Sequence, residues 1–248
     1  MYNVLVSGAE GRMGKEVILK IADSPDLDVV CGFNRTENFE GSFPIYSNFS
    51  EIKEKIDIII DFSHVHTTLK VLEYANSNHI PIVIATTGFN TEQEKIIENY
   101  SKTLPIFKSA NMSFDINLMC DLVSKLAPLL AGSDIEITET HHRNKVDSPS
   151  GTALLLANSI NESLGGKMKY VYNRHDLSKK REDNEIGFSS IRGGNIVGEH
   201  TVQFFSPYET FEIKHTSYSR SVFAEGALKA ALFIIDKPNG LYSMKDLI

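Results

Sequence analysis

Short apolar runs alternate with amphipathic helical patterns over the N-terminal part of the chain. The runs predict strands at residues 4–6, 27–33, 56–62, 81–85 and 104–107, and the helical patterns lie at 15–24, 65–78 and 91–102. The run at 56–62, IDIIIDF, is almost continuously apolar, which indicates a strand covered on both faces. Strands of this kind, separated by helices, form parallel sheets from βαβ units. We therefore predict an α/β domain of the Rossmann type, with a doubly wound parallel sheet.

The pattern changes after residue 111. Helices are predicted at 114–131, 152–164 and 222–235, and strands at 135–141, 186–192, 196–205 and 211–218. Polar residues alternate with a sparse apolar set in the strand at 135–141, which suggests that one sheet face is wet. Successive strands without intervening helices predict a second, α+β domain with an open mixed sheet. We expect residues 1–112 and 221–248 to form the first domain, with the last helix packed back on it, and residues 113–220 to form the second.

Composition and charge narrow the class of protein. The 248 residues include 25 Lys and Arg against 32 Asp and Glu, a formal charge of −7, and 42% are hydrophobic. These are globular values, and the acidic balance argues against a protein that coats nucleic acid. No apolar run approaches the roughly 20 residues that a bilayer crossing needs, and the N-terminus lacks a signal-peptide pattern. Cys31 and Cys120 lie in apolar segments and support neither disulfides nor a cysteine zinc site. We expect a cytoplasmic enzyme with no nucleic-acid or membrane partner.

A glycine-rich turn joins the first predicted strand to the first predicted helix. It consists of Gly8, Ala9, Glu10, Gly11, Arg12, Met13 and Gly14. Glycines let such a turn bend tightly and let a pyrophosphate approach, while the N–H groups at the start of the helix hold the phosphates. A tight turn without a ligand also needs glycine, but the position on the first βα turn favours a dinucleotide site. A P-loop is rejected because Glu16 follows Lys15 where Ser or Thr is required.

The ends of the following strands carry candidates for cofactor recognition. Asn34 stands about 20 residues past the last glycine, where the adenosine ribose is expected, and Arg35 follows it. An acidic residue there would favour a free 2′-hydroxyl, whereas Asn beside Arg offers a cation to a 2′-phosphate. We predict NADPH at least as readily as NADH, the alternative being that Arg35 is a solvated loop residue. Residues 61–63 and 85–89 are candidates for a nicotinamide–ribose pocket, although turn chemistry explains Thr-Thr-Gly equally well.

The densest chemical constellation is ETHHRNKVDSPSGT at residues 139–152. His141, His142, Arg143 and Lys145 concentrate positive charge in an acidic protein. Strand alternation sends the two histidines to opposite sides, and no ligand set stands at zinc spacing nearby, so we expect no metal site. The segment 148–152 is typical of a helix start, whose N–H groups and hydroxyls bind a carboxylate as readily as a phosphate. The cluster predicts a pocket for an acidic small substrate, unless it is only a solvated loop and a helix cap.

Other features limit the chemistry. Arg192 and Arg220 are further candidate cations, whereas residues 179–181, KKR, are expected to form a mobile surface loop. The chain has no Tyr-x-x-x-Lys pair of the short-chain dehydrogenase type and no Gly-x-Ser-x-Gly elbow. Cys120 lies in a helical pattern without an activating partner. Proton transfer by His or Lys, accompanying hydride transfer, is the simplest remaining chemistry.

With these motifs the whole chain resembles the bacterial 4-hydroxy-tetrahydrodipicolinate reductases, also called dihydrodipicolinate reductases. The resemblance rests on residues 8–14, 61–63, 86–89, 110–113 and 196–201, and above all on 139–152, which looks like the family signature. Asn34 stands where many members have Glu, and Ala85 where many have Gly. The resemblance implies an oxidoreductase that reduces a cyclic dicarboxylate in diaminopimelate and lysine biosynthesis.

The resemblance also implies roles for individual residues. His141 would be a proton donor and acceptor and Lys145 a proton donor, while NADPH or NADH gives hydride to ring C4 and a proton arrives at C3. Substrate-binding roles fall to His142, Ser150, Gly151 and Thr152. The implied cofactor-binding residues are Gly8, Ala9, Glu10, Gly11, Arg12, Met13, Asn34, Arg35, Ala85, Thr86, Thr87, Ala110, Asn111, Met112 and Ser113. Clustered cations suit this chemistry because they stabilise the dianion and the charge that develops on the ring nitrogen.

By the same resemblance, residues 1–112 and 221–248 are the dinucleotide-binding domain, and 113–220 the substrate-binding and oligomerisation domain of a homotetramer. Closure between the domains would bring cofactor and substrate together. Two alternatives stay open. Another Rossmann dehydrogenase of the aspartate pathway is disfavoured by the lack of an activated thiol. An NAD(P)-sensing binding module would be expected to carry a helix-turn-helix or a basic face, and the sequence pattern indicates neither.

Overall fold

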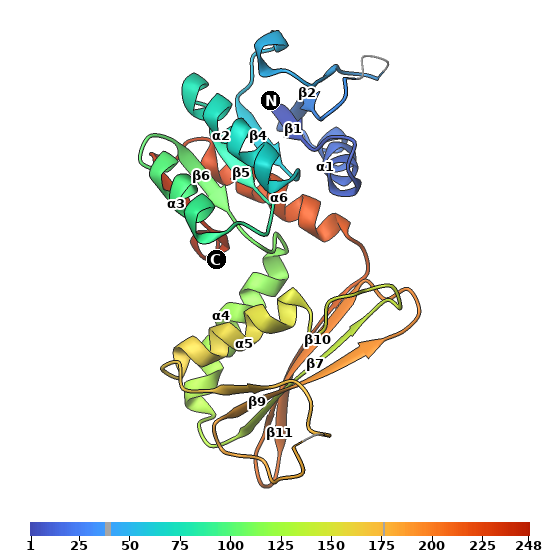
Figure 1. Cartoon of the computed structure of the whole chain (residues 1–248), viewed down its shortest axis with the longest axis vertical. Coiled ribbons are helices and arrows are strands. Elements are labelled where there is room, and N and C mark those ends of the chain that lie inside the picture. The colour runs from blue at the N-terminus through green and yellow to red at the C-terminus, as the bar shows by residue number, and fades with distance from the viewer. Residues whose placement is uncertain (38–40, 176) are drawn as a thin grey trace. The chain divides into compact units, whose positions relative to one another are not determined.

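The computed structural model describes residues 1–37, 41–175 and 177–248. The chain divides into two compact units (Figure 1). Unit 1 consists of Met1–Phe114 and Arg220–Ile248, and unit 2 of Asp115–Ser219. In the described part of the chain, no helix combines the length and the apolar character that a membrane crossing requires.

Unit 1 is built on a seven-stranded sheet in which every pairing is parallel. The strand order is β12-β6-β5-β4-β1-β2-β3. The strands are β1 (Tyr2–Ser7), β2 (Leu27–Phe33), β3 (Ile45–Tyr46), β4 (Ile58–Asp61), β5 (Ile82–Ile84), β6 (Pro105–Lys108) and β12 (Gly240–Tyr242). The order reverses at β1, where the chain leaves toward β2 on one side and returns to β4 on the other. This arrangement confirms the predicted Rossmann-type sheet, whose ligands bind beyond the carboxyl ends of the strands at such a reversal.

Helices cover both faces of this sheet and explain its apolar strands. One core joins the sheet to α1 (Arg12–Ala22) and α6 (Ser221–Ile234), and a second joins it to α2 (Val65–Asn78) and α3 (Thr91–Tyr100). The middle of β4 shows the consequence, since Ile58, Ile59 and Ile60 alternate between the two cores and all are fully buried. The short strands β3 and β12 were not predicted, because two or three residues are too few to give a periodic signal.

Unit 2 is a five-stranded mixed sheet covered by helices on one face (Figure 1). Its strands are β7 (Asp134–His141), β8 (Lys169–Val171), β9 (Glu185–Arg192), β10 (Gly198–Phe205) and β11 (Thr210–Ser217), in the order β11-β10-β7-β9-β8. β7 and β8 pair with β9 in parallel, and the other pairings are antiparallel. The helices α4 (Phe114–Leu129) and α5 (Gly151–Ser163) pack on alternate residues of β7 and β10, such as Ile137 and Val202. The intervening polar residues leave the other face wetter, as predicted.

One surface expectation is met only in part. Residues 179–181 lie outside any helix or strand, and Lys179 and Lys180 are exposed as expected, but the Arg181 side chain is only 18% exposed and is anchored to the sheet. Its guanidinium pairs with Glu136, its Nε lies 2.9 Å from Asp134 Oδ1, and its Nη2 donates to the carbonyl oxygens of Ile135 (3.0 Å) and Glu185 (2.6 Å). The rigid fork of five donors matches this set of acceptors, which composition alone does not reveal.

Candidate active site

The glycine-rich turn of unit 1 is as tight as a dinucleotide cradle requires. Gly8 has φ +77°, and a Cβ there would lie 2.6 Å from the carbonyl oxygen of Phe62. At Gly14 a Cβ would lie only 2.1 Å from the carbonyl oxygen of Gly8, so the first turn of α1 packs directly on the end of β1. Gly11 is the N-cap of α1 and offers no side-chain cap. These residues fit a pyrophosphate held at the N-terminus of α1. Glycines have no side chain, so a ligand can approach the backbone N–H groups of the turn closely.

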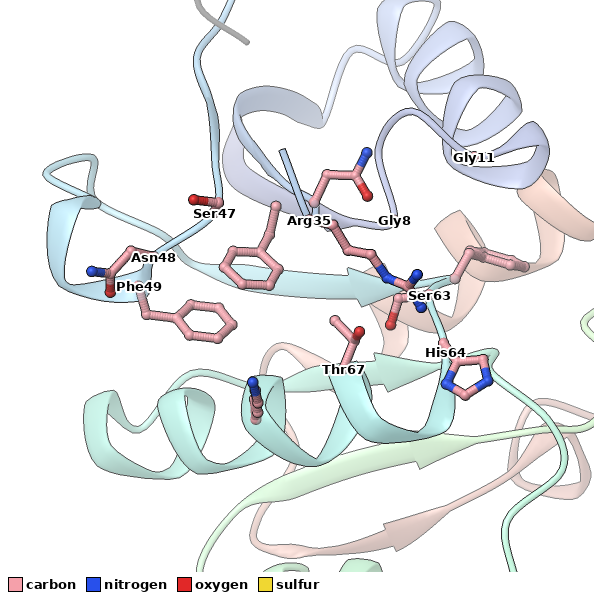
Figure 2. A pocket seen from close by; sticks show the side chains of 13 residues that line it. Gly8, Gly11, Arg35, Ser47, Asn48, Phe49, Ser63, His64 and Thr67 are labelled. Atoms are coloured by element: carbon pink, nitrogen blue, oxygen red, sulfur yellow. The ribbon is translucent and has the colours of Figure 1, made fainter. Parts of the chain in front are cut away.

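A pocket of about 550 Å³ lies beside this turn (Figure 2). It is lined by Gly8, Gly11, Phe33, Asn34, Arg35, Ser47, Asn48, Phe49, Phe62, Ser63, His64, Thr67 and Lys70. Four predicted cofactor residues therefore share one wall, namely Gly8, Gly11, Asn34 and Arg35. The remaining predicted cofactor residues are not part of this lining, although Ala9, Glu10, Arg12 and Met13 belong to the same turn.

An acidic side chain from the glycine turn lies beside the end of β2, a contact that the sequence pattern did not predict. The Asn34 Nδ2 group donates to Glu10 Oε2 at 2.5 Å, so the carboxylate of the glycine turn stands beside the expected ribose position. The Thr36 hydroxyl lies 3.5 Å from the same oxygen. Arg35 and Lys70 bring positive charge to the same pocket. The Glu10 carboxylate, suited to a free 2′-hydroxyl, thus lies beside a pocket whose lining includes cations suited to a 2′-phosphate.

The candidate residues at the ends of β4 and β5 are tied together by one buried carboxylate. Asp61 is fully buried and accepts hydrogen bonds from the hydroxyls of Ser63 (2.5 Å), Thr68 (2.6 Å) and Thr86 (2.7 Å). The Thr86 side chain therefore points into the protein, whereas Thr87 is exposed. Any contact of residues 85–87 with a ligand falls to the backbone and to Thr87, as turn chemistry allows.

Residues 110–113 connect β6 to α4. Asn111 Oδ1 accepts the backbone N–H of Ser113 at 2.9 Å, and Met112 and Ser113 are buried. The Met112 carbonyl packs so closely on α6 that a Cβ at Gly226 would lie 1.6 Å from its oxygen. The path of this connection is therefore set by contacts within unit 1.

The part of the pocket lining that comes from segments outside the glycine turn and the end of β2 was not predicted from the sequence. Asn48 and Phe49 begin the 3₁₀ turn Phe49–Glu51, and Thr67 and Lys70 come from α2. Phe49 stacks on Phe33 with ring centroids 3.9 Å apart, which places the turn against the end of β2. The only local signal was Asn48, whose side chain accepts the backbone N–H of Ser50 as an N-cap.

In unit 2 the constellation at residues 139–152 forms a connected polar cluster. His141 Nδ1 lies 2.5 Å from Glu139 Oε2, and the other carboxylate oxygen accepts the backbone N–H of Ser150 at 3.1 Å. Ser150 is the N-cap of α5, and its hydroxyl accepts the N–H of Ala153 and lies 2.9 Å from His200 Nε2. Glu139, His141, Ser150 and His200 are all buried. A strand end, a helix start and a neighbouring strand thus meet through side chains that can carry protons.

Burial and charge shift the titration of these groups. Burial raises the pKa of Glu139, but hydrogen bonds from Arg192, Ser190 and His141 outweigh it and bring that pKa down to about 2. Burial lowers the pKa of His141 against the opposing effect of Glu139, and it lowers the pKa of His200 to about 3. At neutral pH the cluster therefore holds an ionised carboxylate next to neutral imidazoles.

Lys145 and the start of α5 lie at the edge of this cluster. Lys145 Nζ is 2.8 Å from Asp147 Oδ1, and the Asp147 carboxylate also accepts the backbone N–H of Gly151. The hydrogen bond from Lys145 lowers the pKa of Asp147. A Cβ at Gly151 would meet no atom within 4 Å, so this end of the helix is open. An ammonium and a helix N-terminus that already hold one carboxylate are suited to hold another.

The other predicted residues of this region have different surroundings. His142 is half-buried, donates its backbone N–H to Ile196 at 2.7 Å, and has a buried Nδ1 without a hydrogen-bond partner in the described part of the chain. Arg143 is exposed. Arg192, predicted as a further candidate cation, pairs with both oxygens of Glu139, at 2.8 and 2.7 Å. Among the described residues no group of three or more His, Cys, Asp or Glu side chains is arranged to hold a metal.

Comparison with known proteins places this geometry in a family. Residues 2–112 match the family model described as dihydrodipicolinate reductase, N-terminus, and residues 115–248 match dihydrodipicolinate reductase, C-terminus. The 4-hydroxy-tetrahydrodipicolinate reductase of Caldanaerobacter subterraneus subsp. tengcongensis is 46% identical, covering 100% of this chain and 98% of the relative. That of Clostridium novyi is 43% identical over the same shares of the two chains.

The fold has solved counterparts. A dipicolinate-bound dihydrodipicolinate reductase from Paenisporosarcina sp. TG-14 superposes with a TM-score of 0.82, at 24% identity and 100% coverage of both chains. A structure of an amine dehydrogenase from Mycobacterium smegmatis superposes with a TM-score of 0.64 at 7% identity, covering 98% of this chain and 95% of that one. The family models and the relatives above 40% identity decide the relationship: the chain belongs to the dihydrodipicolinate reductase family.

Proposed function

We propose that this protein is a 4-hydroxy-tetrahydrodipicolinate reductase, which uses NADH or NADPH to reduce a cyclic dicarboxylate in diaminopimelate and lysine biosynthesis. The observation that carries the proposal is the cluster of unit 2, in which a buried His141–Glu139 pair, Lys145 and the open start of α5 belong to one stretch of chain. Two relatives that are 46% and 43% identical to this chain, over 98% of their own length, carry this enzyme name.

The cofactor is proposed to bind to unit 1 at the turn of residues 8–14. The turn fits a pyrophosphate because it is tightly closed: a Cβ at Gly8 or Gly14 would collide with backbone atoms and force the turn open. Asn34 and Arg35 are proposed to meet the adenosine ribose, with the Glu10 carboxylate beside Asn34 accepting a 2′-hydroxyl and Arg35 contacting a 2′-phosphate. Residues 85–87 and 110–113 are proposed to contact the cofactor chiefly through their backbone. When bound, the cofactor supplies the hydride.

The substrate is proposed to bind to unit 2. One carboxylate would be held by the backbone at Gly151 and Thr152, at the start of a helix that Ser150 caps. Lys145 and His142 would contact the substrate beside it. This assignment is supported by the Asp147 carboxylate, which already contacts Lys145 Nζ and the Gly151 N–H.

Proton delivery is assigned to His141 and Lys145. His141 is a buried imidazole with one ring nitrogen committed to Glu139, which leaves the other to exchange a proton with the substrate. Lys145 is a half-buried ammonium whose side chain is 20% exposed, so it can reach a ligand at the start of α5. The surrounding positive charge stabilises negative charge that develops during the reaction.

A coupled assay tests the function directly. Pyruvate and aspartate semialdehyde are supplied with the preceding synthase. Consumption of NADH or NADPH is followed, with and without the protein, by the loss of the absorbance that belongs to the reduced cofactor alone. We expect the protein to accelerate consumption strongly. An unchanged rate would refute the assignment.

The roles of His141 and Lys145 are tested by truncation. His141→Ala and Lys145→Ala are each expected to lower kcat about 10²- to 10⁴-fold, the usual contribution of a proton-transfer group, and to leave the Kd of NADH nearly unchanged. Equal loss of turnover and of cofactor binding would instead mean a structural role.

We further propose that the enzyme is a cytoplasmic homotetramer. Aromatic side chains are exposed on the edge strand β11, where Phe211 is 47% exposed, and on the neighbouring β10, where Phe205 is 38% exposed. Exposed aromatic side chains on an edge strand suit a contact between copies of the chain. Sedimentation at micromolar concentration tests this, and a monomer would refute it.

A further inference from the structure

The cluster of unit 2 is organised around a carboxylate whose contacts are all internal. Glu139 is fully buried, and its two oxygens receive His141 Nδ1 (2.5 Å), the backbone N–H of Ser150 (3.1 Å) and both terminal nitrogens of Arg192 (2.8 and 2.7 Å). Ser190 supplies a further hydrogen bond to this carboxylate. Removing an ionised carboxylate from water is costly, and a bidentate arginine with three further donors offsets that cost. Hydrophobic side chains of similar size would fill this space with less penalty, so a role besides stability is the more economical explanation.

We infer that Glu139 and Arg192 form a positioning pair that holds both proton-transfer residues of the proposed reductase, His141 and Lys145, in their working geometry. Neither member of the pair is proposed to touch the substrate. The inference rests on the proposed function for its catalytic consequence, but the geometry that it predicts can be measured without any substrate.

Glu139 acts on His141 through the ring nitrogen that it contacts. A carboxylate can only accept, so the neutral imidazole must carry its proton on Nδ1, and Nε2 is left as the nitrogen that exchanges a proton. Nε2 faces Gly198, where a Cβ would lie 3.1 Å away, so this side of the ring is kept free of a side chain. The charged or titratable groups that face His141 are Glu139 on β7, Arg192 on β9, Lys145 in the following loop and His200 on β10.

Arg192 acts on Lys145 through the intervening loop. Besides pairing with Glu139, its Nη2 donates to the carbonyl oxygen of Asp147 at 2.7 Å. The Asp147 side chain in turn holds Lys145 Nζ at 2.8 Å. One guanidinium, contributed from β9 some 50 residues away in sequence, thus fixes the segment between the histidine and the start of α5. Lysine could not reproduce this, because one ammonium lacks the planar fork that reaches three acceptors.

A matched control lies on the same strand. Glu136 is three residues before Glu139 on β7 and also pairs with arginines, with Arg174 Nη2 at 2.9 Å and with Arg181. It does not contact His141, Lys145 or Arg192 in the described structure. Glu136→Gln therefore removes a second carboxylate–arginine pair of the same strand, one whose carboxylate is 25% exposed, without disturbing the proposed positioning.

The first experiment compares Glu139→Gln, Arg192→Lys and Glu136→Gln. For Glu139→Gln we expect kcat to fall at least about tenfold, a fraction of what a general acid–base group contributes, with the Kd of NADH unchanged because it binds to the other unit. The inflection of the kcat–pH profile that belongs to His141 should move to lower pH, since the carboxylate favours the imidazolium. Arg192→Lys should be intermediate, and Glu136→Gln should match the wild type. Equal kcat values and pH profiles for Glu139→Gln and Glu136→Gln would overturn the inference.

The second experiment needs no folded variant of Glu139. In the wild-type protein labelled with ¹⁵N-histidine, long-range ¹H–¹⁵N spectra at pH 7.5 report the tautomer of each neutral imidazole, and loss of a signal set in His141→Gln assigns His141. We expect the Nδ1–H tautomer for His141. An Nε2–H tautomer would overturn the inference whatever the kinetics show. If the wild type shows the Nδ1–H tautomer but no reductase activity, the proposed function fails while the pair stands as a structural feature.

Discussion

Gly14 offers the sharpest test of the glycine turn. An ideal Cβ at this position would lie 2.1 Å from the carbonyl oxygen of Gly8, and side-chain carbons do not approach closer than 3.0 Å, so the turn and α1 must separate by 0.9 Å. Both atoms are held by backbone, and overpacking of this kind costs about 1–3 kcal/mol. The strain falls on the N–H groups proposed to hold the pyrophosphate. We therefore expect Gly14→Ala to weaken NADH binding about 5- to 150-fold, which is that energy expressed as affinity.

The assay is a titration of cofactor fluorescence, with urea unfolding of the free protein measured in parallel. Gly41→Ala is the matched control, because it adds the same methyl group to a glycine of unit 1 outside the pocket lining, where the nearest atom, the carbonyl oxygen of Phe43, would lie 3.6 Å away. We expect its Kd to stay within about threefold of the wild type, less than 1 kcal/mol. Wild-type affinity in Gly14→Ala, or equal losses in the two variants, would refute the argument that close packing of α1 on the turn creates the cofactor site.

Three further outcomes are expected. Arg35→Ala should raise the Kd of NADPH about tenfold, with little change in the Kd of NADH, because the guanidinium attracts a 2′-phosphate. Glu10→Gln should lower the Kd of NADPH, because the carboxylate repels a 2′-phosphate. Parallel titrations of both cofactors check these two outcomes. Burial lowers the pKa of His200 to about 3, so the unfolded chain binds this proton at a higher pH than the folded chain does. The contribution of neutral His200 to the free energy of unfolding is therefore complete above about pH 6.5 and is lost progressively toward pH 3. The loss should reach about 2 kcal/mol at pH 5, and His200→Gln should remove that part of the difference between urea unfolding at pH 7 and pH 5. Phe107→Ala should cost about 3–5 kcal/mol in the same unfolding measurement, because this side chain is fully buried in the first core; a loss below 1 kcal/mol would contradict the packing described for α6.

The sequence predicted most accurately those helices and strands whose ends are determined by neighbouring residues in the chain. β2 occupies 27–33 and α2 occupies 65–78, as expected, because an apolar period runs the whole length of each and ends where it is interrupted. His79, with φ +54°, ends α2 just past its last periodic residue. The first helix was predicted to start at residue 15, three residues late, because the small and polar residues of its first turn carry no apolar period.

What the sequence could not show depends on contacts between distant residues. Arg192 was recognised as a cation, but its pairing with Glu139 spans 53 residues and follows only from the parallel pairing of β7 with β9. Thr86 was recognised at a strand end, but whether its hydroxyl faced a ligand or Asp61 depended on the neighbouring strand. The wall of the pocket that includes Phe49 and Lys70 comes from segments without a motif, placed by the stacking of Phe49 on Phe33 and by the packing of α2.

The ion pair between Lys145 and Asp147 has a consequence for selectivity. A ligand carboxylate that takes over Lys145 Nζ and the Gly151 N–H exchanges one anion for another, and the net gain from that exchange is small. Selectivity among carboxylate ligands must then come from the contacts made by the rest of the ligand, beyond its first carboxylate. Picolinate, which has a single carboxylate, should accordingly compete much more weakly than pyridine-2,6-dicarboxylate. Raising the ionic strength should reduce the difference in affinity between the two ligands, because salt screens the interaction of the second carboxylate.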